Sequence, residues 1–495
     1  MLRALVVLTC LAACPSSTPT TTTPTTAIAP ATAPPTDAAA KPTAATPDLL
    51  PVRPVRHTLA VGDHHSCALV RKGDDPRGRV KCWGRNEDGQ LGLGDTKVRG
   101  KTSKQMGDAL PFVPLPEGVD VVAIDAEQRR TCALASDGKL WCWGSNDDGE
   151  LGLGDTNPRG DQRDEMASLV PVDLPGKVIA FTLGSMHTCA QLAGGAVHCW
   201  GRGDAVGDSQ RRGAAPAQMG AALPAVALGK GLQPIAVAAG SSHTCVLLAH
   251  AKIKCFGEGM YGVIGTGDTR SRGADPNDMG DALPFVELGS FRAAEIVAGG
   301  LHACARSVDH RVKCWGNNHS GQLGLGHRDG PGGKPGQSRA APPGGDARPD
   351  VDLGASGTVI ALASNSVTTC ALLDRGRAAD GALDHAIKCW GGSAGGDREG
   401  TMGAALPVID VGPAFVPMAI APSDLLGCAI VVERERTIGP ERPTTGRVKC
   451  WGAWVPGVGI SPGTGMPDKS RVESLSEYTP LVELGADVRV VIPDA

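Results

Sequence analysis

Aromatic residues are scarce in this sequence: phenylalanine, tyrosine and tryptophan make up 3% of the 495 residues. Together with 68 glycines and 38 prolines, this composition argues against long helices and an aromatic-rich core, and it favours short elements joined by many turns. An excess of basic residues is also missing, because the formal net charge is -4. The sequence therefore lacks the positive field that recruits nucleic acid, and we expect no nucleic-acid partner.

A long hydrophobic run is missing from the N-terminus. Residues 1–14, MLRALVVLTCLAAC, hold one early arginine, a short apolar run and small residues. Because a membrane-spanning helix needs roughly 20 apolar residues, this layout predicts an export signal instead. One interpretation is an ordinary signal peptide in which Cys14 is incidental. The other rests on the resemblance of LAAC (11–14) to a bacterial lipobox, which implies cleavage before Cys14 and acylation of its thiol.

The segment after Cys14 lacks apolar periodicity. Threonine, proline and alanine dominate residues 15–50, which predicts a disordered tether. We thus expect a lipoprotein signal peptide at 1–13, a lipidated cysteine and tether at 14–50, and a folded region at 51–495. The lipid would be the only membrane contact. By the enterobacterial sorting pattern, Pro15 favours anchoring at the bacterial outer membrane or cell surface.

Of the 16 cysteines, none is left over once Cys10 and Cys14 in the N-terminal segment are set aside. In CALASDGKLWC (132–142), a three-residue loop ending at Gly138 would place the two cysteines opposite each other on paired strands, within disulfide range. Zinc knuckles and redox motifs need a closer Cys-x2-Cys spacing. Because an exported chain is expected to be oxidised, we predict these structural disulfides: Cys67–Cys82, Cys132–Cys142, Cys189–Cys199, Cys245–Cys255, Cys304–Cys314, Cys370–Cys389 and Cys428–Cys450.

The second cysteine of each pair starts a repeated motif. CWG begins at 82, 142, 199, 314, 389 and 450, and CFG begins at 255. Each unit reads as four short strands, for example 178–184, 187–192 and 196–201 followed by a fourth after a long polar connection. Seven such units predict an all-β fold, a closed seven-bladed β-propeller of four-stranded blades. Either 56–62 or 486–494 could complete the first blade, and the sequence leaves this open.

Segments after CWG carry a family resemblance. GRNEDGQLGLGD (84–95), GSNDDGELGLGD (144–155) and GNNHSGQLGLGH (316–327) resemble the regulator of chromosome condensation repeat. The resemblance covers roughly 57–492 and implies a seven-bladed propeller. The cysteine pairs and MGDALPFVELG (279–289) resemble a variant found in exported bacterial proteins. The family's nucleotide-exchange activity on a nuclear GTPase is not expected here, since an exported chain would not meet that enzyme and propellers host many functions.

We predict no catalytic residues, metal or cofactor. His65, His187, His243 and His302 each stand two residues before a cysteine, where a hydrogen bond within the blade is expected rather than metal ligation. NEDG (86–89) and NDDG (146–149) lack the full spacing of a calcium loop and predict turns. An enzyme of the propeller type with an unrecognised active site remains an alternative. It would need acidic or metal-binding side chains converging on the central channel, and the sequence shows no such non-repeat cluster.

Function is sought in departures from the repeat. The loops 68–81, 371–388 and 429–449 are longer than the others, and they belong to units that become consecutive when the ring closes. Loops on a rigid scaffold are common binding surfaces, and arginine is favoured in recognition. We therefore hypothesise that a monomer contacts an unidentified envelope or extracellular macromolecule there; solvated loops on a structural spacer are the alternative. The candidate binding residues are Arg77, Arg79, Arg375, Arg377, Arg434, Arg436 and Arg442.

Overall fold

The computed structural model describes residues 49–51, 56–329, 344–355, 357–392, 394–423, 426–452 and 481–493. The expected signal peptide, Cys14 and nearly all of the expected tether lie outside these residues. The regular structure of the described residues consists of β-strands and short 3-10 helices. None of the helices in these ranges is long and apolar enough to cross a membrane.

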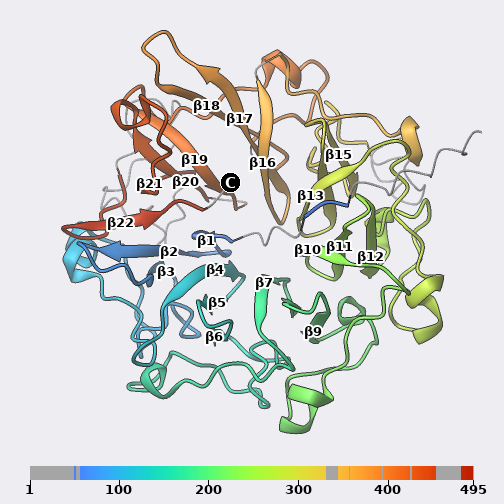
Figure 1. Cartoon of the computed structure of the whole chain (residues 1–495), viewed down its shortest axis with the longest axis horizontal. Helices are drawn as coiled ribbons and strands as arrows, with labels where there is room; N and C mark the ends of the chain where they lie inside the picture. The colour runs from blue at the N-terminus through green and yellow to red at the C-terminus, as the bar shows by residue number, and fades with distance from the viewer. Residues whose placement is uncertain are drawn as a thin grey trace, which may run out of the picture. The chain divides into compact units, whose positions relative to one another are not determined.

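Seven antiparallel blades surround a central channel, with the first strand of each blade innermost (Figure 1). The alternation of short apolar runs with turn residues produces this arrangement, because each blade can bury its faces only against its neighbours. The strands of blades 1 to 7, in order, are β1 (Leu59–Val61), β2 (His65–Lys72), β3 (Arg79–Gly84); β4 (Val121–Glu127), β5 (Arg130–Ala135), β6 (Leu140–Gly144); β7 (Val178–Leu183), β8 (His187–Leu192), β9 (Val197–Gly201); β10 (Pro234–Ala239), β11 (His243–Leu248), β12 (Ile253–Gly257); β13 (Ala293–Ala298), β14 (His302–Ser307), β15 (Val312–Gly316); β16 (Thr358–Asn365), β17 (Thr368–Arg377), β18 (Leu383–Trp390); β19 (Phe415–Ala421), β20 (Leu426–Glu433), β21 (Thr445–Gly452), with β22 (Val488–Val491) shared between blades 7 and 1.

The connections between blades hold the 3-10 helices. They are η1 (Ser103–Gln105), η2 (Gly107–Ala109), η3 (Met166–Ser168), η4 (Asp204–Val206), η5 (Pro216–Gln218), η6 (Gly220–Ala222), η7 (Met260–Gly262), η8 (Pro276–Asp278), η9 (Gly280–Ala282), η10 (Gly345–Ala347), η11 (Gly403–Ala405) and η12 (Arg434–Thr437), of which η12 lies within the β20–β21 loop.

The expected fourth strand of each blade is reduced to an irregular edge segment. In blade 3, Val226 N donates to Val197 O at 2.8 Å, and in blade 4 Val286 N donates to Ile253 O at 2.8 Å. Proline stands two residues earlier in both segments, at Pro224 and Pro284. Because proline cannot donate to a ladder, the outer edge forms a bridge rather than a full strand. The prediction of four regular strands per blade was therefore wrong by one.

The two segments predicted as alternatives for the first blade, 56–62 and 486–494, both contribute to closing the ring. Their strands, β1 and β22, lie one after the other along the same edge of β2. β1 pairs with residues 66–68 of β2, and β22 pairs with residues 70–72 on the same edge. Thr58 Oγ1 donates to Val491 O at 2.5 Å, where the two short segments meet. β22 also pairs with β21 of blade 7. The inner strand of blade 1 is thus built from both ends of the folded region, which leaves no open edge at the junction.

The seven expected disulfides are bonded in the structure, each joining the second and third strands of one blade. In blade 2, Ala135 N donates to Lys139 O at 2.9 Å, which leaves a three-residue loop. Gly138 ends that loop with a φ of 86°, a conformation that glycine adopts without strain. Cys132 and Cys142 consequently lie in register, with Cα atoms 4.1 Å apart.

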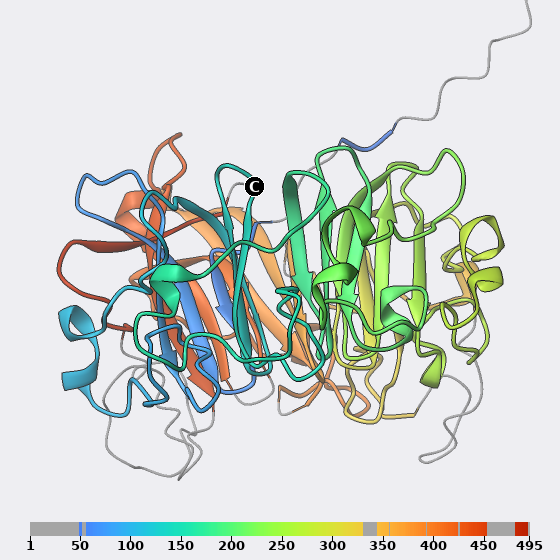
Figure 2. The same ribbon diagram turned by 90° about the horizontal axis from the view of Figure 1, so that it is seen from below.

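Tryptophans of the CWG motif lie where blades meet. Trp143, which follows Cys142, is fully buried, and its Nε1 donates to Gln90 O of blade 1 at 3.0 Å. Trp200 bonds Glu150 O of blade 2 in the same way at 2.9 Å. The loops between the second and third strands lie on one side of the ring, which we call the hairpin face (the upper side in Figure 2), and the turns that follow CWG lie on the opposite turn face.

Candidate functional site

The two longest hairpins, those of blades 6 and 7, are bonded to each other on the hairpin face. Arg377 at the end of β17 donates through Nη1 to Thr437 O at 3.0 Å and through Nη2 to Gly439 O at 2.6 Å. Leu383 N donates to Thr437 Oγ1 at 3.1 Å. We call residues 374–384 and 433–445 the joined hairpins. Figure 1 shows the β17–β18 hairpin extending outward beside blade 7.

An ion pair adds to this junction. Arg434 Nε lies 2.7 Å from Asp380 Oδ2, and a second bond joins Arg434 Nη2 to Asp380 Oδ1 at 3.1 Å. The bond from Arg434 holds the pKa of the Asp380 carboxyl below its usual value. Bidentate pairing fixes the orientation of both side chains. The two loops are therefore held together by side chains as well as by the blades that carry them.

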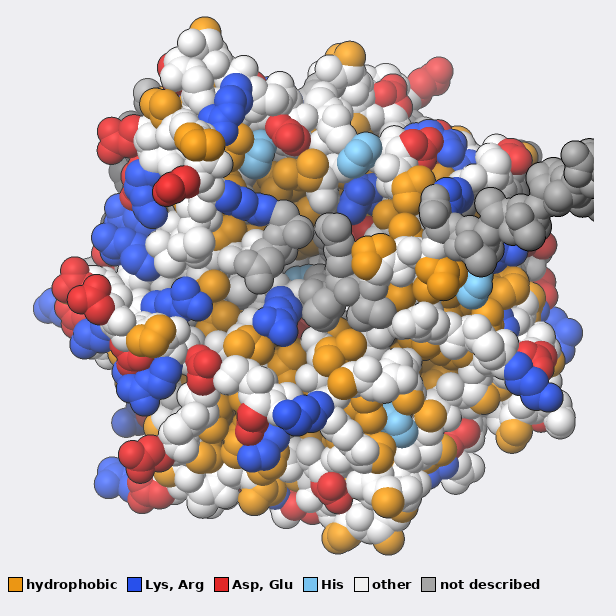
Figure 3. Space-filling model, viewed as in Figure 1, with side chains coloured by type: hydrophobic (Ala, Val, Ile, Leu, Met, Phe, Trp, Pro, Cys, Tyr) orange, Lys and Arg blue, Asp and Glu red, His pale blue; other side chains and the backbone are white. Residues whose placement is uncertain are grey.

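The remaining candidate arginines have different surroundings. Arg375 pairs with Asp384 at 2.6 Å and Arg436 with Glu433 at 3.2 Å, whereas Arg442 is exposed. The joined hairpins thus present paired charges of both signs, and Figure 3 shows blue and red side chains interspersed over this face.

The blade 1 hairpin bonds to blade 2 rather than to the joined hairpins in the described contacts. Gly78 N donates to Asp120 Oδ1 at 2.7 Å. Arg77 pairs with Asp75 at 2.9 Å, and the Arg79 guanidinium lies 3.8 Å from the centre of the Phe112 ring. The structure brings the blade 6 and blade 7 loops together and turns the blade 1 loop toward the other neighbour.

The repeated histidines link each blade to the next. His65 Nε2 lies 2.8 Å from Thr131 Oγ1, His187 Nε2 lies 2.8 Å from Thr244 Oγ1, and His302 Nε2 lies 2.7 Å from Thr369 Oγ1. Burial lowers the pKa of His65 to about 4 and that of His187 and His302 to about 3, so these rings are neutral. Over the described ranges, no group of three or more His, Cys, Asp or Glu side chains could hold a metal ion.

His243 is the exception among these histidines. Neither ring nitrogen of His243 has a partner in the described part of the chain, because blade 5 has Ala303 where blades 2, 4 and 6 have threonine. In those blades the threonine hydroxyl accepts from or donates to the histidine of the preceding blade. Thr244 Oγ1 additionally donates to Ala205 O at 2.9 Å, so a threonine can serve two buried partners at once.

We expect Ala303→Thr to stabilise the protein by about 1 kcal/mol, because it supplies the missing partner of a fully buried imidazole. Denaturant unfolding measures the change. Ala303→Val is the matched control, since it adds similar volume without a hydroxyl. Equal effects of the two substitutions would show that packing, not the hydrogen bond, accounts for the difference.

Blade 2 departs from the repeat at two coupled positions, which the sequence analysis missed. In blades 1, 3, 4 and 5 the histidine is preceded three residues earlier by a glycine, and a Cβ on Gly184 would lie 2.2 Å from His187 Cε1. Blade 2 has Arg130 in place of the histidine and Glu127 in place of the glycine. Without an imidazole at position 130, a side chain at position 127 meets no clash. The replacement of histidine by Arg130 therefore permits the replacement of glycine by Glu127. Aligning the seven units on their cysteines would have revealed both.

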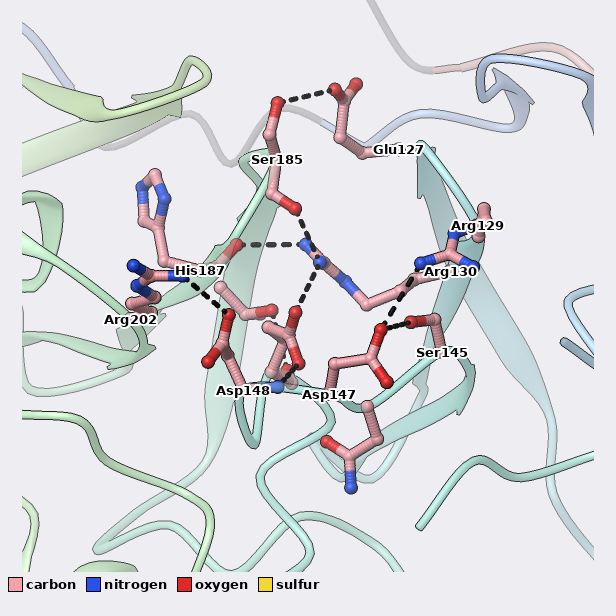
Figure 4. A network of polar contacts seen from close by, with 12 residues as sticks. Glu127, Arg129, Arg130, Ser145, Asp147, Asp148, Ser185, His187 and Arg202 are labelled. Carbon is pink, nitrogen blue, oxygen red and sulfur yellow. Dashed lines mark hydrogen bonds and ion pairs between the residues drawn. The ribbon is translucent and has the colours of Figure 1, made fainter. Parts of the chain in front are cut away.

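Arg130 forms a buried charged junction between blades 2 and 3 (Figure 4). Its side chain is 2% exposed, and it donates to Ser185 O at 2.9 Å, to His187 O at 3.1 Å and to Gly184 O. Glu150 Oε1 lies 3.6 Å from Arg130 Nη1 and is also buried. The corresponding turns of blades 1 and 5 have glutamine, so the carboxylate accompanies the arginine. The pair balances the charge of Arg130 while the carbonyls satisfy its donors.

Three carboxyl groups at positions outside the repeat pattern border the central channel. Asp125, Glu127 and Glu295 all border this cavity. All three accept a hydrogen bond from the next blade: Asp125 Oδ2 accepts from Leu183 N at 3.0 Å, and Glu295 Oε1 accepts from Leu362 N at 3.0 Å. Glu127 accepts from Ser185 Oγ at 3.3 Å. Burial, reinforced by Asp63 and Asp125, raises the pKa of Glu127 to about 8.

The raised pKa makes Glu127 a source of pH-dependent stability. Between its usual pKa of 4.5 and about 8, the folded state holds a proton that the unfolded state releases. Stability from this group is therefore present below pH 4.5 and is lost as the pH rises through 8. We expect Glu127→Gln to make unfolding less sensitive to pH across this window, measured by urea denaturation at pH 5 and pH 9. Glu117→Gln, at an exposed site, should leave the slope unchanged; a similar change there would contradict the assignment.

Two models of the regulator of chromosome condensation (RCC1) repeat match the chain, one at residues 77–134 and 137–191 and the other at 57–90, 121–150 and 293–322. The ultraviolet-B receptor UVR8 of Arabidopsis thaliana is 26% identical over 276 residues, covering 54% of each chain. The secretion-regulating guanine nucleotide exchange factor of Bos taurus is 28% identical, covering 53% of this chain and 52% of its own. The chain thus spans about half the length of these relatives, and 22% of the human probable ubiquitin ligase HERC6.

Solved propeller structures have the same fold. Human WBSCR16 superposes with a TM-score of 0.52 at 15% identity, covering 76% of this chain and 86% of its own. Yeast RCC1 (Prp20), solved bound to Kap60, gives 0.51 at 16% identity and covers 80% of both chains. These identities are low enough that the likeness concerns the fold alone. The chain thus contains regulator of chromosome condensation (RCC1) repeats within residues 57–191 and 293–322, and its seven-bladed fold is the one that these solved structures share.

Proposed function

We propose that the protein is an exported, non-enzymatic binding scaffold, and that its joined hairpins contact a macromolecular partner at the cell envelope or outside the cell. The observation that carries this proposal is the set of side-chain bonds between the two loops, above all those of Arg377 and Arg434. A surface that is already ordered before binding loses little conformational freedom when a partner arrives.

The chemistry of the joined hairpins suits a protein partner. Ile438, between Thr437 and Gly439, has an exposed fraction of 53%, and the pairs Arg434–Asp380 and Arg375–Asp384 flank it with both signs of charge. An apolar centre with a polar, mixed-charge rim is the common anatomy of a protein interface. The proposal also draws on relatives: one yeast RCC1 structure is bound to Kap60, and another concerns its binding to Gsp1p and histones.

The location outside the cytosol rests on the disulfides and on the N-terminal sequence. Seven disulfides indicate an oxidising, extracellular compartment, because cytosolic thiols are kept reduced. We further propose that Cys14 is acylated and that residues 15–50 act as the tether to the bacterial outer membrane or cell surface. Metabolic labelling with a fatty acid tests this part, and labelling that persists in Cys14→Ala would contradict it.

Capture from envelope fractions tests the proposed interface. We expect the wild type to retain a discrete partner at least tenfold better than a variant in which 375–383 and 434–444 are replaced by short turns. The matched control replaces 73–78 of the blade 1 hairpin, which should leave capture unchanged. Undiminished capture by the first variant, with its folding verified by circular dichroism, would exclude the joined hairpins as the interface.

A further inference from the structure

Blade 5 carries a buried arginine at a position that other blades give to leucine. Arg348 follows η10, and its exposed fraction is 2%. The equivalent residue after the corresponding 3-10 helices is Leu110, Leu223, Leu283 or Leu406, each buried to the same degree. An apolar position has thus received a guanidinium group without becoming exposed.

This guanidinium lacks hydrogen-bond acceptors in the described part of the chain. Nε, Nη1 and Nη2 of Arg348 are all buried and unpartnered there. Its Cζ lies 5.6 Å from the centre of the Trp315 ring. Burial lowers the pKa of Arg348 only to about 10, so the group stays charged at neutral pH. A buried charge with unsatisfied donors is strongly unfavourable unless an acceptor is supplied.

Buried cations elsewhere in the propeller do have acceptors. Lys388 Nζ donates to Leu353 O and to Gly403 O, both at 2.8 Å, and Arg130 donates to three carbonyls of blade 3. The lack of partners at Arg348 is therefore a property of this site. It is not how the propeller accommodates charge in general.

A second departure from the repeat lies in the same turn, beside a groove. Gly344 stands where other blades have methionine, and Met106, Met166, Met219 and Met279 are all buried. Gly344 and Gly345 line a groove of about 570 Å³ together with Phe285, Glu287 and Phe291. A Cβ on Gly344 would lie 2.0 Å from Glu287 Oε2, so the carboxylate occupies space that a side chain would take.

We propose that Arg348 is the anchor of an oxyanion site at the junction of blades 4 and 5, entered through the groove beside Gly344. A planar guanidinium fork matches the paired oxygens of a carboxylate or a phosphate group. Lys313 adds positive charge, since its Nζ donates to the backbone carbonyl of Arg348 while lying 3.6 Å from Asp350 Oδ1. Glu287 is the opposing charge at the entrance, and it weakens binding without preventing it.

Thermal unfolding in acetate, inorganic phosphate or chloride at constant ionic strength tests the proposal. We expect acetate or phosphate to raise the Tm of the wild type saturably, by on the order of a few degrees, and Arg348→Leu to lose this response. The leucine variant carries the residue of the other blades and should fold. Arg328→Leu, which removes an exposed arginine that pairs with Asp397 of blade 6, is the control and should respond like the wild type. A Tm shift in acetate alone would assign the ligand to the carboxylates, and a shift in phosphate alone would assign it to the phosphates.

Glu287→Gln separates an anion site from a simple counterion. If an anion enters beside Glu287, removing this negative charge should lower the concentration needed for half of the Tm shift several-fold. An unchanged half-saturation in Glu287→Gln would overturn the proposed entrance. The site itself is overturned if the wild type and Arg348→Leu respond equally, if the wild type shows no saturable response, or if chloride alone is effective.

Discussion

Reduced protein is expected to lose its cooperative fold at room temperature. Each disulfide closes a loop with a sequence separation between 10 and 22 residues, which contributes roughly 3 kcal/mol in the chain-entropy model. Seven such contributions approach about 20 kcal/mol, which exceeds the roughly 5–15 kcal/mol that typically separates folded from unfolded states. Small aliphatic residues dominate the core. The free energy from hydrophobic burial is therefore too small to compensate for the loss of the disulfides.

The measurement is circular dichroism after unfolding and refolding with and without a reductant, because the cysteines are buried in the native state. A single-bridge variant, Cys132→Ala with Cys142→Ala, should fold with a loss of about 3 kcal/mol. A reduced chain that refolds to the native spectrum with an unchanged Tm would show that the blades are stable without their bridges.

Replacing Arg130 by alanine is expected to cost about 3–5 kcal/mol of unfolding free energy. The substitution leaves the buried carboxylate of Glu150 without its partner and frees three carbonyls of blade 3. It also removes the cation that partly offsets the raised pKa of Glu127. Urea unfolding compares Arg130→Ala with Arg129→Ala, the neighbouring arginine that lies near the surface, for which a loss below about 1 kcal/mol is expected.

A double variant provides the decisive comparison. In a Glu127→Gly background, which makes room for the ring, Arg130→His with Glu150→Gln gives blade 2 the residues of blades 1 and 5, and the imidazole can then reach Thr188 as His65 reaches Thr131. We expect this double variant to recover most of the stability lost in Arg130→His alone, since glutamine removes the unpaired charge. Additive losses in the two single variants would contradict the coupling of Arg130 with Glu150.

The sequence predicted the features that repeat. Cysteines that face each other across a three-residue loop determined the strand register of blade 2, and the CWG period determined the number of blades. Features that occur in a single blade could not be predicted, because no repeat supports them. The joined β1 and β22 were missed because each short segment alone has the pattern of a complete inner strand. A regular fourth strand was predicted because the edge segments have alternating apolar residues. The proline in these segments cannot donate a hydrogen bond, and it limits their pairing with the third strand.

The candidate surface was predicted in outline only. Sequence order placed the hairpins of blades 1, 6 and 7 next to one another, but the bond between Arg434 and Asp380 joins residues 54 positions apart and depends on how the hairpins lean. The orientation of the blade 1 hairpin likewise brings Gly78 to Asp120 of blade 2. Arg442 stays a candidate by its exposure. The signal peptide, the acylation of Cys14 and the tether remain predictions, since they lie outside the described residues.

Site-specific photo-crosslinking in intact cells tests the proposed interface most directly. A photoreactive residue at position 438, at the apex of the joined hairpins, is compared with one at 170, which is equally exposed on blade 2. We predict a discrete crosslinked species at 438 that disappears when Arg377→Ala and Arg434→Ala separate the hairpins. Discrete crosslinks at 170 with none at 438 would contradict the assignment of the joined hairpins as the binding surface.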